Sequence, residues 1–360
     1  MEQKKAMIAM SGGVDSSVAA RLMLDAGFAC MGATMRLYDG ENPETPGSCC
    51  SADDAEDARS VARKLGIPFH VFNCKSEFDK KVIQDFISSY EAGLTPNPCI
   101  QCNRHLKFDH MLRLAQTLGY EILVTGHYAR VRFDDKTGRY LLLKAADPSK
   151  DQSYVLYCIN QEQLSHIRFP LGELSKQQVR AIAEESGLIT AHKQDSQDIC
   201  FVPDGDYAGF MERYTGKQYP DGQFLDLDGN VVGIHKGAVR YTLGQRKGLG
   251  LAMGSPVYVC AKNMDANTVT VGPNEALFHS ALRAVDWNWF PFPQLDAPMR
   301  VMARHRYNQK EQSATVYPEE NGSARVIYDQ PQRAITPGQA VVLYDGEMVI
   351  GGGTITEVLE

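Results

Sequence analysis

Long apolar runs are missing from this sequence of 360 residues. No stretch approaches the roughly 18 apolar residues that a membrane-spanning helix needs. The apolar run after the opening MEQKK is too short for a secretory signal, and the start is not an Arg- and Ser-rich transit peptide. We therefore expect a cytoplasmic protein.

Internal repeats, low-complexity tracts and an excess of positive charge are also missing. The net charge of -7 does not point to a nucleic-acid-binding protein. It does not exclude one either, because local basic patches rather than overall charge hold RNA. The composition, 43% hydrophobic and 22% charged, is ordinary for a globular protein, and the length suggests roughly two to three domains.

The cysteines do not form a recognisable disulfide framework. There are nine, and an odd number without a secretory signal argues against structural disulfides. Cys49 and Cys50 are predicted to be loop residues near the active site. Four others lie inside apolar runs and are expected to be buried and unreactive: Cys30, Cys74, Cys158 and Cys260.

The first third of the chain alternates between strand and helix patterns. Strands are predicted at 6–10, 30–35, 69–73 and 122–125, and helices at 14–26, 53–65, 77–90 and 103–118. This alternation predicts an α/β fold with a parallel, doubly wound sheet. Ligands bind beyond the carboxyl ends of such strands, so residues 10–16, Met35 and 126–127 are expected to converge.

The remaining chain divides into segments with different secondary-structure patterns. Residues 38–51 and 95–103 (TPNPCIQCN) are predicted loops, and 147–187 is predicted to be helical, with Gly187 ending its last helix. After about residue 204, short strands and turn signals dominate. We predict three domains: a catalytic domain, a small central β-rich domain and a C-terminal β-barrel, at 1–203, 204–275 and 276–360.

The segment SGGVDSS, residues 11–17, lies between the first predicted strand and helix. Its glycines permit close approach of an anion, and the helix start offers free N–H groups and a positive dipole end. Ser16 and Ser17 add hydroxyl donors, and Asp15 is suited to help hold Mg²⁺. The lysine of a P-loop ATPase is missing. The plain alternative is a helix that follows a strand and binds nothing.

SGGVDSS resembles the pyrophosphate-binding loop of the PP-loop ATP pyrophosphatases, which split ATP between the α and β phosphates. Further motifs follow in order: TPNPCIQCNRHLKFD, GHYAR, KDQSY, KQDSQDICFVPDGDY and YTLGQRKGLG. With SGGVDSS they closely resemble the bacterial tRNA-uridine 2-sulfurtransferases, or 2-thiouridylases. The resemblance covers essentially the whole chain, through HRY at 305–307 and TPGQAVVLYDGE at 336–347.

This resemblance implies ATP-dependent 2-thiolation of the wobble uridine in tRNAs such as those for Lys, Glu and Gln. The uridine 2-oxygen is a poor leaving group until adenylation converts it into a phosphate ester. A sulfur nucleophile then attacks carbon 2. The implied co-substrate is ATP with Mg²⁺, and the implied sulfur source is a persulfide from a cysteine desulfurase or a sulfur-relay protein.

The resemblance also implies roles for three cysteines. Cys200 is the persulfide carrier and Cys102 the nucleophile, joined in a transient disulfide that an external reductant resets. Cys99 stands where many family members carry an acidic residue, so its role as a base is open. As alternatives, Cys99, Cys102 and Cys200 hold a [4Fe–4S] cluster, or the CxxC is half of a zinc site.

Other site residues are carried over by position from the family. The target base, flipped out of its stack, is expected at Asn97, Pro98 and Cys99. The expected ATP-binding residues are Ala9, Met10, Ser11, Gly12, Gly13, Val14, Asp15, Ser16, Met35 and Gly126. The expected tRNA-binding residues are His127, Lys150, Asp151, Gln152, Arg306, Tyr307 and Gln339.

Residue patterns alone leave other functions open. An adenylating amide ligase would use the same glycine turn but would need no paired cysteines. A zinc-stabilised RNA-binding protein would bind tRNA without consuming ATP. A thiolase acting on another base is a third alternative. From sequence, Met35 is equally well explained as a core methionine, and the arginines of 300–306 as a solvated strand face.

Overall fold

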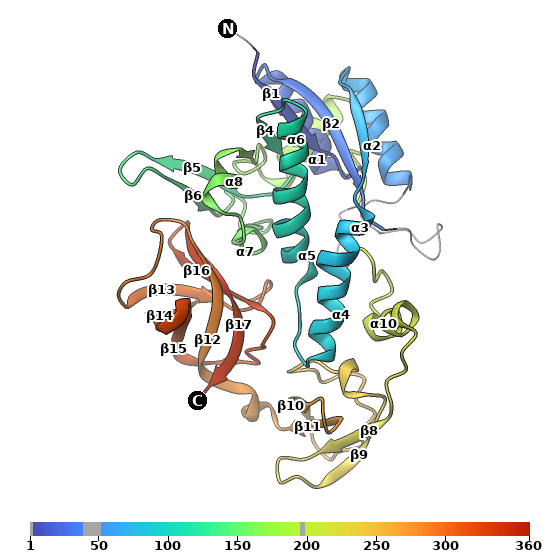
Figure 1. Ribbon diagram of the computed structural model, residues 1–360, viewed down its shortest axis with the longest axis vertical. Helices are drawn as coiled ribbons and strands as arrows, with labels where there is room; N and C mark the ends of the chain where they lie inside the picture. The colour runs from blue at the N-terminus through green and yellow to red at the C-terminus, as the bar shows by residue number, and fades with distance from the viewer. Residues whose placement is uncertain (1–2, 39–51, 195–198) are drawn as a thin grey trace.

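The first part of the chain folds around a five-stranded parallel sheet, at the top of Figure 1. The computed structural model describes residues 3–38, 52–194 and 199–360, so Cys49 and Cys50 lie outside the described residues. The strand order is β3-β2-β1-β4-β7. The strands are β1 (Lys5–Ala9), β2 (Ala29–Arg36), β3 (Phe69–Asn73), β4 (Ile122–Val124) and β7 (Ile167–Arg168). The predicted doubly wound α/β fold is confirmed.

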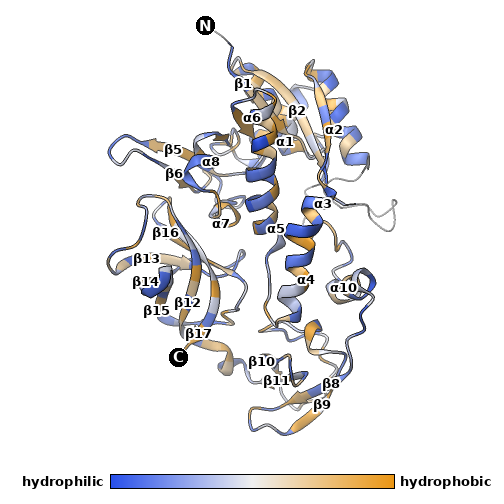
Figure 2. Cartoon of the chain, in the orientation of Figure 1, coloured by the Kyte–Doolittle hydropathy of each residue, from blue (hydrophilic) through white to orange (hydrophobic). Residues whose placement is uncertain are grey.

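Helices cover both faces of this sheet because successive strand side chains point to opposite sides. Ala6 and Ile8 of β1 enter one buried cluster, and Met7 enters another. The first cluster includes residues of α1 (Val14–Asp25), α2 (Ala52–Leu65) and α9 (Lys176–Glu185). The second includes residues of α3 (Lys75–Phe78), α4 (Gln84–Glu91) and α6 (Met111–Thr117). Figure 2 shows the contrast between the apolar strands and the polar outer sides of α2 and α6.

Two long helices on the second face each contain a π-helical stretch. One runs through α3, η1 (Asp79–Ile83) and α4, and the other through α5 (Pro98–Gln101), η2 (Cys102–His110) and α6. The prediction of a loop over 95–103 is wrong from Pro98 onward. Asn97 caps the helix by accepting the Ile100 N–H, and Pro98 lies in its first turn, where a missing N–H costs nothing.

The segment 147–187 is helical only in part. It contains α7 (Ser153–Leu156), α8 (Gln161–Ser165), β7 and α9. Capping boxes at Asn160 and Ser175 begin α8 and α9, and Gly187, with φ of +59°, follows α9 as predicted. The prediction is wrong at β7. Sequence reasoning also missed the hairpin of β5 (Arg130–Asp134) and β6 (Arg139–Leu143).

The predicted C-terminal β-barrel is confirmed. Its strands are β12 (Phe278–Trp289), β13 (Met299–Arg304), β14 (Gln312–Pro318), β15 (Ala324–Arg333), β16 (Ala340–Asp345) and β17 (Met348–Leu359). They follow the order β12-β15-β14-β13-β16-β17, and pairing of β12 with β17 closes the sheet. The β5–β6 hairpin extends this sheet, because Leu143 pairs with Met348.

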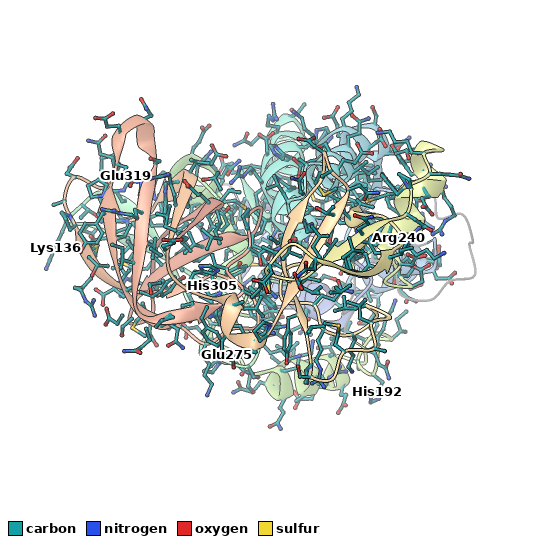
Figure 3. The ribbon with its side chains drawn as sticks, turned by 90° about the horizontal axis from the view of Figure 1, so that it is seen from below. Lys136, His192, Arg240, Glu275, His305 and Glu319 are labelled. Atoms are coloured by element: carbon teal, nitrogen blue, oxygen red, sulfur yellow. The ribbon has the colours of Figure 1, made fainter. Side chains whose placement is uncertain are left out.

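A small β module lies at the bottom of Figure 1. Its strands are β8 (Gly222–Leu225), β9 (Val231–His235), β10 (Tyr258–Asn263) and β11 (Thr268–Gly272). Helix α10 (Tyr207–Thr215) precedes it, in the region where short strands and turns were predicted to dominate. Seen from below, the barrel with Glu319 and the module with Arg240 lie side by side (Figure 3).

One buried cluster joins the sheet region to the barrel. Tyr154 and Tyr157 of the first region share it with Val342 and Tyr344 of the barrel. Because the hairpin and this cluster cross the predicted boundaries, the division at 203 and 275 stays a prediction. None of the described helices has the length and apolar character needed to cross a membrane.

Candidate active site

The glycine turn is held between two strands at the carboxyl end of β1. The Met10 N–H donates to the Ala33 carbonyl at 2.8 Å, and the Thr34 hydroxyl donates to the Met10 carbonyl at 2.6 Å. Gly12 then adopts φ of +75°, which favours glycine. These contacts fix the path of the chain into α1.

Two glycines allow backbone segments to meet at this turn. A Cβ atom on Gly12 would lie 2.2 Å from the Asp54 carbonyl oxygen of α2. A Cβ atom on Gly126, just beyond β4, would lie 2.7 Å from the Ser16 nitrogen. The predicted ATP positions before α1 and after β4 are therefore in contact. Met35 is 7% exposed and packs in the second cluster, which leaves its contact with adenine a prediction.

The first turn of α1 is suited to bind an anion. Gly13 lies at the N-cap position of the helix. Because glycine has no side chain, no side-chain cap occupies the first N–H groups of the helix. The Ser16 and Ser17 hydroxyls donate back to the Gly13 carbonyl at 3.1 and 2.8 Å. Ser16 Oγ also accepts from the Ser11 N–H at 3.2 Å. These bonds shape the turn while the helix start points beyond the sheet edge.

Asp15 is held by two side chains that sequence reasoning missed. Lys176 Nζ lies 2.8 Å from each Asp15 carboxylate oxygen, and the Tyr128 hydroxyl donates to Oδ1 at 2.7 Å. Lys176 begins α9, and Tyr128 follows His127. Glycine turn, helix terminus and nearby ammonium together fit a nucleotide phosphate.

Cys99 and Cys102 lie one helical turn apart at the start of the α5 helix. Cys99 is exposed, whereas Cys102 is buried at 8% exposure and begins η2. Residues three apart share a helix face, so the two thiols are stacked on one side. Cys99 is thus exposed and Cys102 buried just after the Asn97 cap.

Cys200 approaches the same buried cluster from a different segment. Cys200 is half-buried and packs with Ile199 against the cluster that contains Cys102. Upstream, Lys193 Nζ pairs with Asp54 and Asp57 of α2, each at 2.6 Å. Because Asp54 also packs on Gly12, Lys193 is anchored beside the glycine turn.

Of the four cysteines predicted to be buried, three are buried and one is not fully so. Cys30, Cys74 and Cys158 are buried, and Cys260 is half-buried. Burial raises the pKa of Cys30, Cys74 and Cys158 to about 11. A thiol that stays protonated is a poor nucleophile, which fits unreactive packing residues.

A ready-made metal site is not found among the residues that the structure describes. No three His, Cys, Asp or Glu side chains of this part come together in an arrangement that could hold a metal ion. The described cysteines likewise form no disulfide. Cys99, Cys102 and Cys200 are therefore not preassembled as cluster ligands in this conformation.

His127 is a neutral side chain at the end of β4. Its Nδ1 lies 2.7 Å from the Thr125 hydroxyl, and Phe108 and Phe169 flank the ring at 5.6 and 6.0 Å between centroids. Burial, with a smaller effect of nearby Lys107, lowers the pKa of His127 well below its ordinary value. His127 can therefore exchange hydrogen bonds but carries no positive charge at neutral pH.

The barrel holds the loop that leads to the cysteine helix. Gln339 Nε2 donates to the Thr95 carbonyl at 2.8 Å and to the Pro96 carbonyl at 3.3 Å. The Thr95 N–H donates to the Pro337 carbonyl at 3.0 Å. Gly338 is in close contact with Thr95. Gln339 thus positions the expected base-contacting residues through the backbone.

Two more predicted tRNA residues of the barrel are engaged within the protein. Arg306 Nη2 donates to the Leu243 carbonyl at 3.0 Å and to Thr336 Oγ1 at 2.7 Å. Tyr307 is 38% exposed, and its hydroxyl donates to the Asp151 carbonyl at 3.4 Å. Arg306 therefore anchors the small module, whereas Tyr307 keeps an exposed ring.

The KDQ segment, residues 150–152, is also tied internally. The Asp151 carboxylate accepts the Ala145 and Ser153 N–H groups and the Ser153 hydroxyl, and it is 3.9 Å from Arg304. Gln152 Oε1 accepts the Tyr128 N–H at 2.9 Å. Lys150 is half-buried. Direct contacts of these residues with tRNA stay predictions.

Comparison with known proteins gives matches along the whole chain. Three family profiles match: "tRNA methyl transferase HUP domain" over 4–204, "tRNA methyl transferase PRC-barrel domain" over 208–273 and "Aminomethyltransferase beta-barrel domain" over 279–355. The tRNA-specific 2-thiouridylase MnmA of Acetivibrio thermocellus is 50% identical over 99% of this chain and 100% of its own length. The protein of the same name from Clostridioides difficile is 48% identical over 99% of each chain.

Solved structures give only distant likeness. A 4-thiouridine synthetase–RNA complex with bound ATP has a TM-score of 0.38 and 17% identity, over 59% of this chain and 50% of that chain. This likeness is too weak to carry an argument about the site.

Proposed function

Because the chain belongs to the tRNA-specific 2-thiouridylase family, we propose that it converts the wobble uridine of tRNA to 2-thiouridine at the expense of ATP. The proposed substrates are tRNAs of the Lys, Glu and Gln type, and the proposed location is the cytoplasm. The observation that carries the proposal is the approach of Cys102 and Cys200 to one buried cluster. Lys193, from the same sequence motif as Cys200, pairs with Asp54 beside the glycine turn.

The first proposed step is adenylation. The uridine 2-oxygen forms a bond to the α phosphorus of ATP, the bond from that phosphorus to the bridging oxygen breaks, and pyrophosphate leaves with the electron pair. The base gives its N3 proton to solvent. The residues 11–16 and Gly126 would bind the phosphates, and Asp15 is suited to help hold Mg²⁺, which neutralises phosphate charge when bound.

The second proposed step transfers sulfur. A persulfide on Cys200, supplied by a cysteine desulfurase or relay protein, attacks carbon 2 through its outer sulfur, and AMP leaves. The Cys102 thiolate then attacks the Cys200 sulfur. The bond between Cys200 and the transferred sulfur breaks, its electron pair stays on the product, and a Cys102–Cys200 disulfide forms. An external thiol reductant restores both thiols.

The test is thiolation of unmodified tRNA by anaerobically purified protein, with ATP, a persulfide donor and a thiol reductant. We expect Cys102→Ser and Cys200→Ser to abolish product, whereas Cys260→Ser, in the small module, keeps wild-type activity. Cys99→Ser is expected to keep most of the activity. Failure of the wild-type protein to thiolate tRNA would overturn the proposal.

Iron analysis of the same preparation separates the relay from a cluster mechanism. The relay predicts thiolation without bound iron. About four irons and four sulfides per chain, with activity that follows cluster content and is lost in Cys99→Ser, would replace it with a [4Fe–4S] mechanism on Cys99, Cys102 and Cys200.

A further inference from the structure

The glycine turn lacks a lysine of its own, yet a lysine from elsewhere in the chain reaches it. Lys176 lies far beyond the turn in sequence, at the first position of α9. Its ammonium touches both carboxylate oxygens of Asp15 at 2.8 Å. Asp15 in turn belongs to the first turn of α1, where the phosphates are expected.

The backbone of Lys176 is fixed, and its side chain is the part that can move. The Ser175 hydroxyl caps α9, and the Lys176 N–H donates to Asp147 Oδ2 at 3.2 Å. The Lys176 side chain is 13% exposed and Asp15 30% exposed, so the pair lies at the edge of the site rather than in the core. A four-carbon stem lets the ammonium shift while α9 stays in place.

Charge explains why a cation is needed here. Asp15 and the phosphates of ATP are all negative, and like charges at short distance repel each other. In the structure Lys176 balances the charge of Asp15, and the Tyr128 hydroxyl is a second partner of that carboxylate. Lys176 can therefore leave Asp15 without stripping it of every hydrogen bond.

Resting on the proposed function, we propose that Lys176 is the cation of the pyrophosphate site, held on Asp15 until ATP binds. When the bond between the α phosphorus and the bridging oxygen breaks, the electron pair goes to that oxygen. The Lys176 ammonium stabilises this negative charge, as preorganised cations do at other phosphoryl-transfer sites. The same shift leaves the Asp15 carboxylate available for the cation that accompanies ATP.

The test measures binding of two products separately, by calorimetry on the full chain with Mg²⁺ present. The probes are inorganic pyrophosphate and AMP. We expect Lys176→Gln to weaken pyrophosphate binding about tenfold to a hundredfold, because a charge-assisted hydrogen bond is lost, and to change AMP binding less than twofold. Lys176→Arg should keep most of the pyrophosphate affinity.

The matched control is Lys144, which makes a comparably buried pair with Glu311 away from the site. Lys144→Gln should leave both affinities unchanged. Unaltered pyrophosphate binding in Lys176→Gln, or equal weakening of pyrophosphate and AMP, would overturn the proposal, since the second result indicates distortion of the whole site.

A second variant covers the case in which an unpaired Asp15 prevents folding of Lys176→Gln. The double variant Asp15→Asn, Lys176→Gln removes both charges of the pair and should fold. It should still bind pyrophosphate weakly, and wild-type affinity would overturn the proposal. Neither measurement uses tRNA or sulfur, so failure of the thiolase assignment is seen in the thiolation assay and is distinguishable from failure here.

Discussion

His305, labelled in Figure 3, is a buried, neutral histidine directly after β13 of the barrel. Its Nε2 lies 3.3 Å from the Arg333 carbonyl oxygen, which can only accept a hydrogen bond. Nε2 therefore carries the proton, and Nδ1 accepts from the Tyr328 hydroxyl at 3.2 Å. Burial lowers the pKa of His305 to about 4, with the carbonyl of Arg333 acting in the opposite direction.

This shift predicts acid sensitivity with a defined sign. The unfolded chain protonates His305 near pH 6.5, and the folded chain only near pH 4. The unfolded state thus binds more protons between these values, so the contribution of His305 to stability is complete above about pH 6.5 and falls as pH decreases toward 4. The loss amounts to about 3 kcal/mol.

Urea unfolding at pH 7 and pH 4.5 measures this effect. His305→Gln should flatten the pH dependence, so that the stability difference between wild type and variant shrinks in acid. His192→Gln, at an exposed position, should follow the wild type. A wild-type slope in His305→Gln would contradict the assignment.

At the scale of elements, the barrel acts on the cysteine helix through one loop. The two bonds of Gln339 to the Thr95 and Pro96 carbonyls fix the chain just before the Asn97 cap. Gln339→Ala should lower thiolation roughly tenfold, because misplacement by about 1 Å can cost a hundredfold, while stability falls by only about 1 kcal/mol.

Single-turnover thiolation and urea unfolding separate these two effects. Gln330→Ala, an exposed position of β15, is the matched control and should change neither quantity. Full activity in Gln339→Ala would show that the Thr95–Pro96 segment keeps its position without the hydrogen bonds from Gln339 of the barrel.

The elements set by local patterns could be predicted from the sequence. Short apolar segments that alternate with helix patterns indicated β1 to β4, and the glycine turn indicated the start of α1. The helix start at Pro98 was also encoded, in an Asn cap followed by proline, but Pro96 and Pro98 were interpreted as fixing a loop. Strand β7 could not be found, because it has two residues and its pairing partner β4 lies far back in the chain. The β5–β6 hairpin was missed although its two strands pair with each other across a short turn.

The same division applies to the candidate site. SGGVDSS and the cysteines carry local signatures. Lys176 has none, since a lysine opening a helix looks like a solvated residue until the fold brings it to Asp15. Tyr128 lies inside the GHYAR motif, but nothing in the sequence links it to Asp15. Arg304 was likewise hidden in a strand that alternates polar and apolar residues.

At the scale of the whole molecule, Arg304 is a largely buried cation between the barrel and the sheet region. Its side chain is 13% exposed and faces Asp151, at 5%, across 3.9 Å. The rings of Tyr154, Tyr307 and Tyr344 lie within 6 Å of its guanidinium carbon, at 5.5, 5.9 and 5.8 Å. Truncating it leaves the buried carboxylate without its counter-charge.

Arg304→Ala should therefore destabilise the protein by about 3 kcal/mol, as loss of one partner of a buried ion pair does. Arg300→Ala, which breaks the exposed pair with Asp329, should cost less than about 1 kcal/mol. Urea unfolding followed by fluorescence measures both, and equal effects of the two substitutions would contradict a special role for Arg304.

The β5–β6 hairpin of the sheet region extends the sheet of the barrel, and this limits how such a protein can evolve. Because β6 pairs with β17, and Tyr157 packs against Gly352 of that strand, the barrel's outer surface is shaped by another part of the chain. A recombination event that exchanged the barrel alone would bring in a β17 without the matching hairpin and without a glycine beneath Tyr157. The sheet region and the barrel are therefore constrained to be inherited together, and the barrel cannot be exchanged on its own.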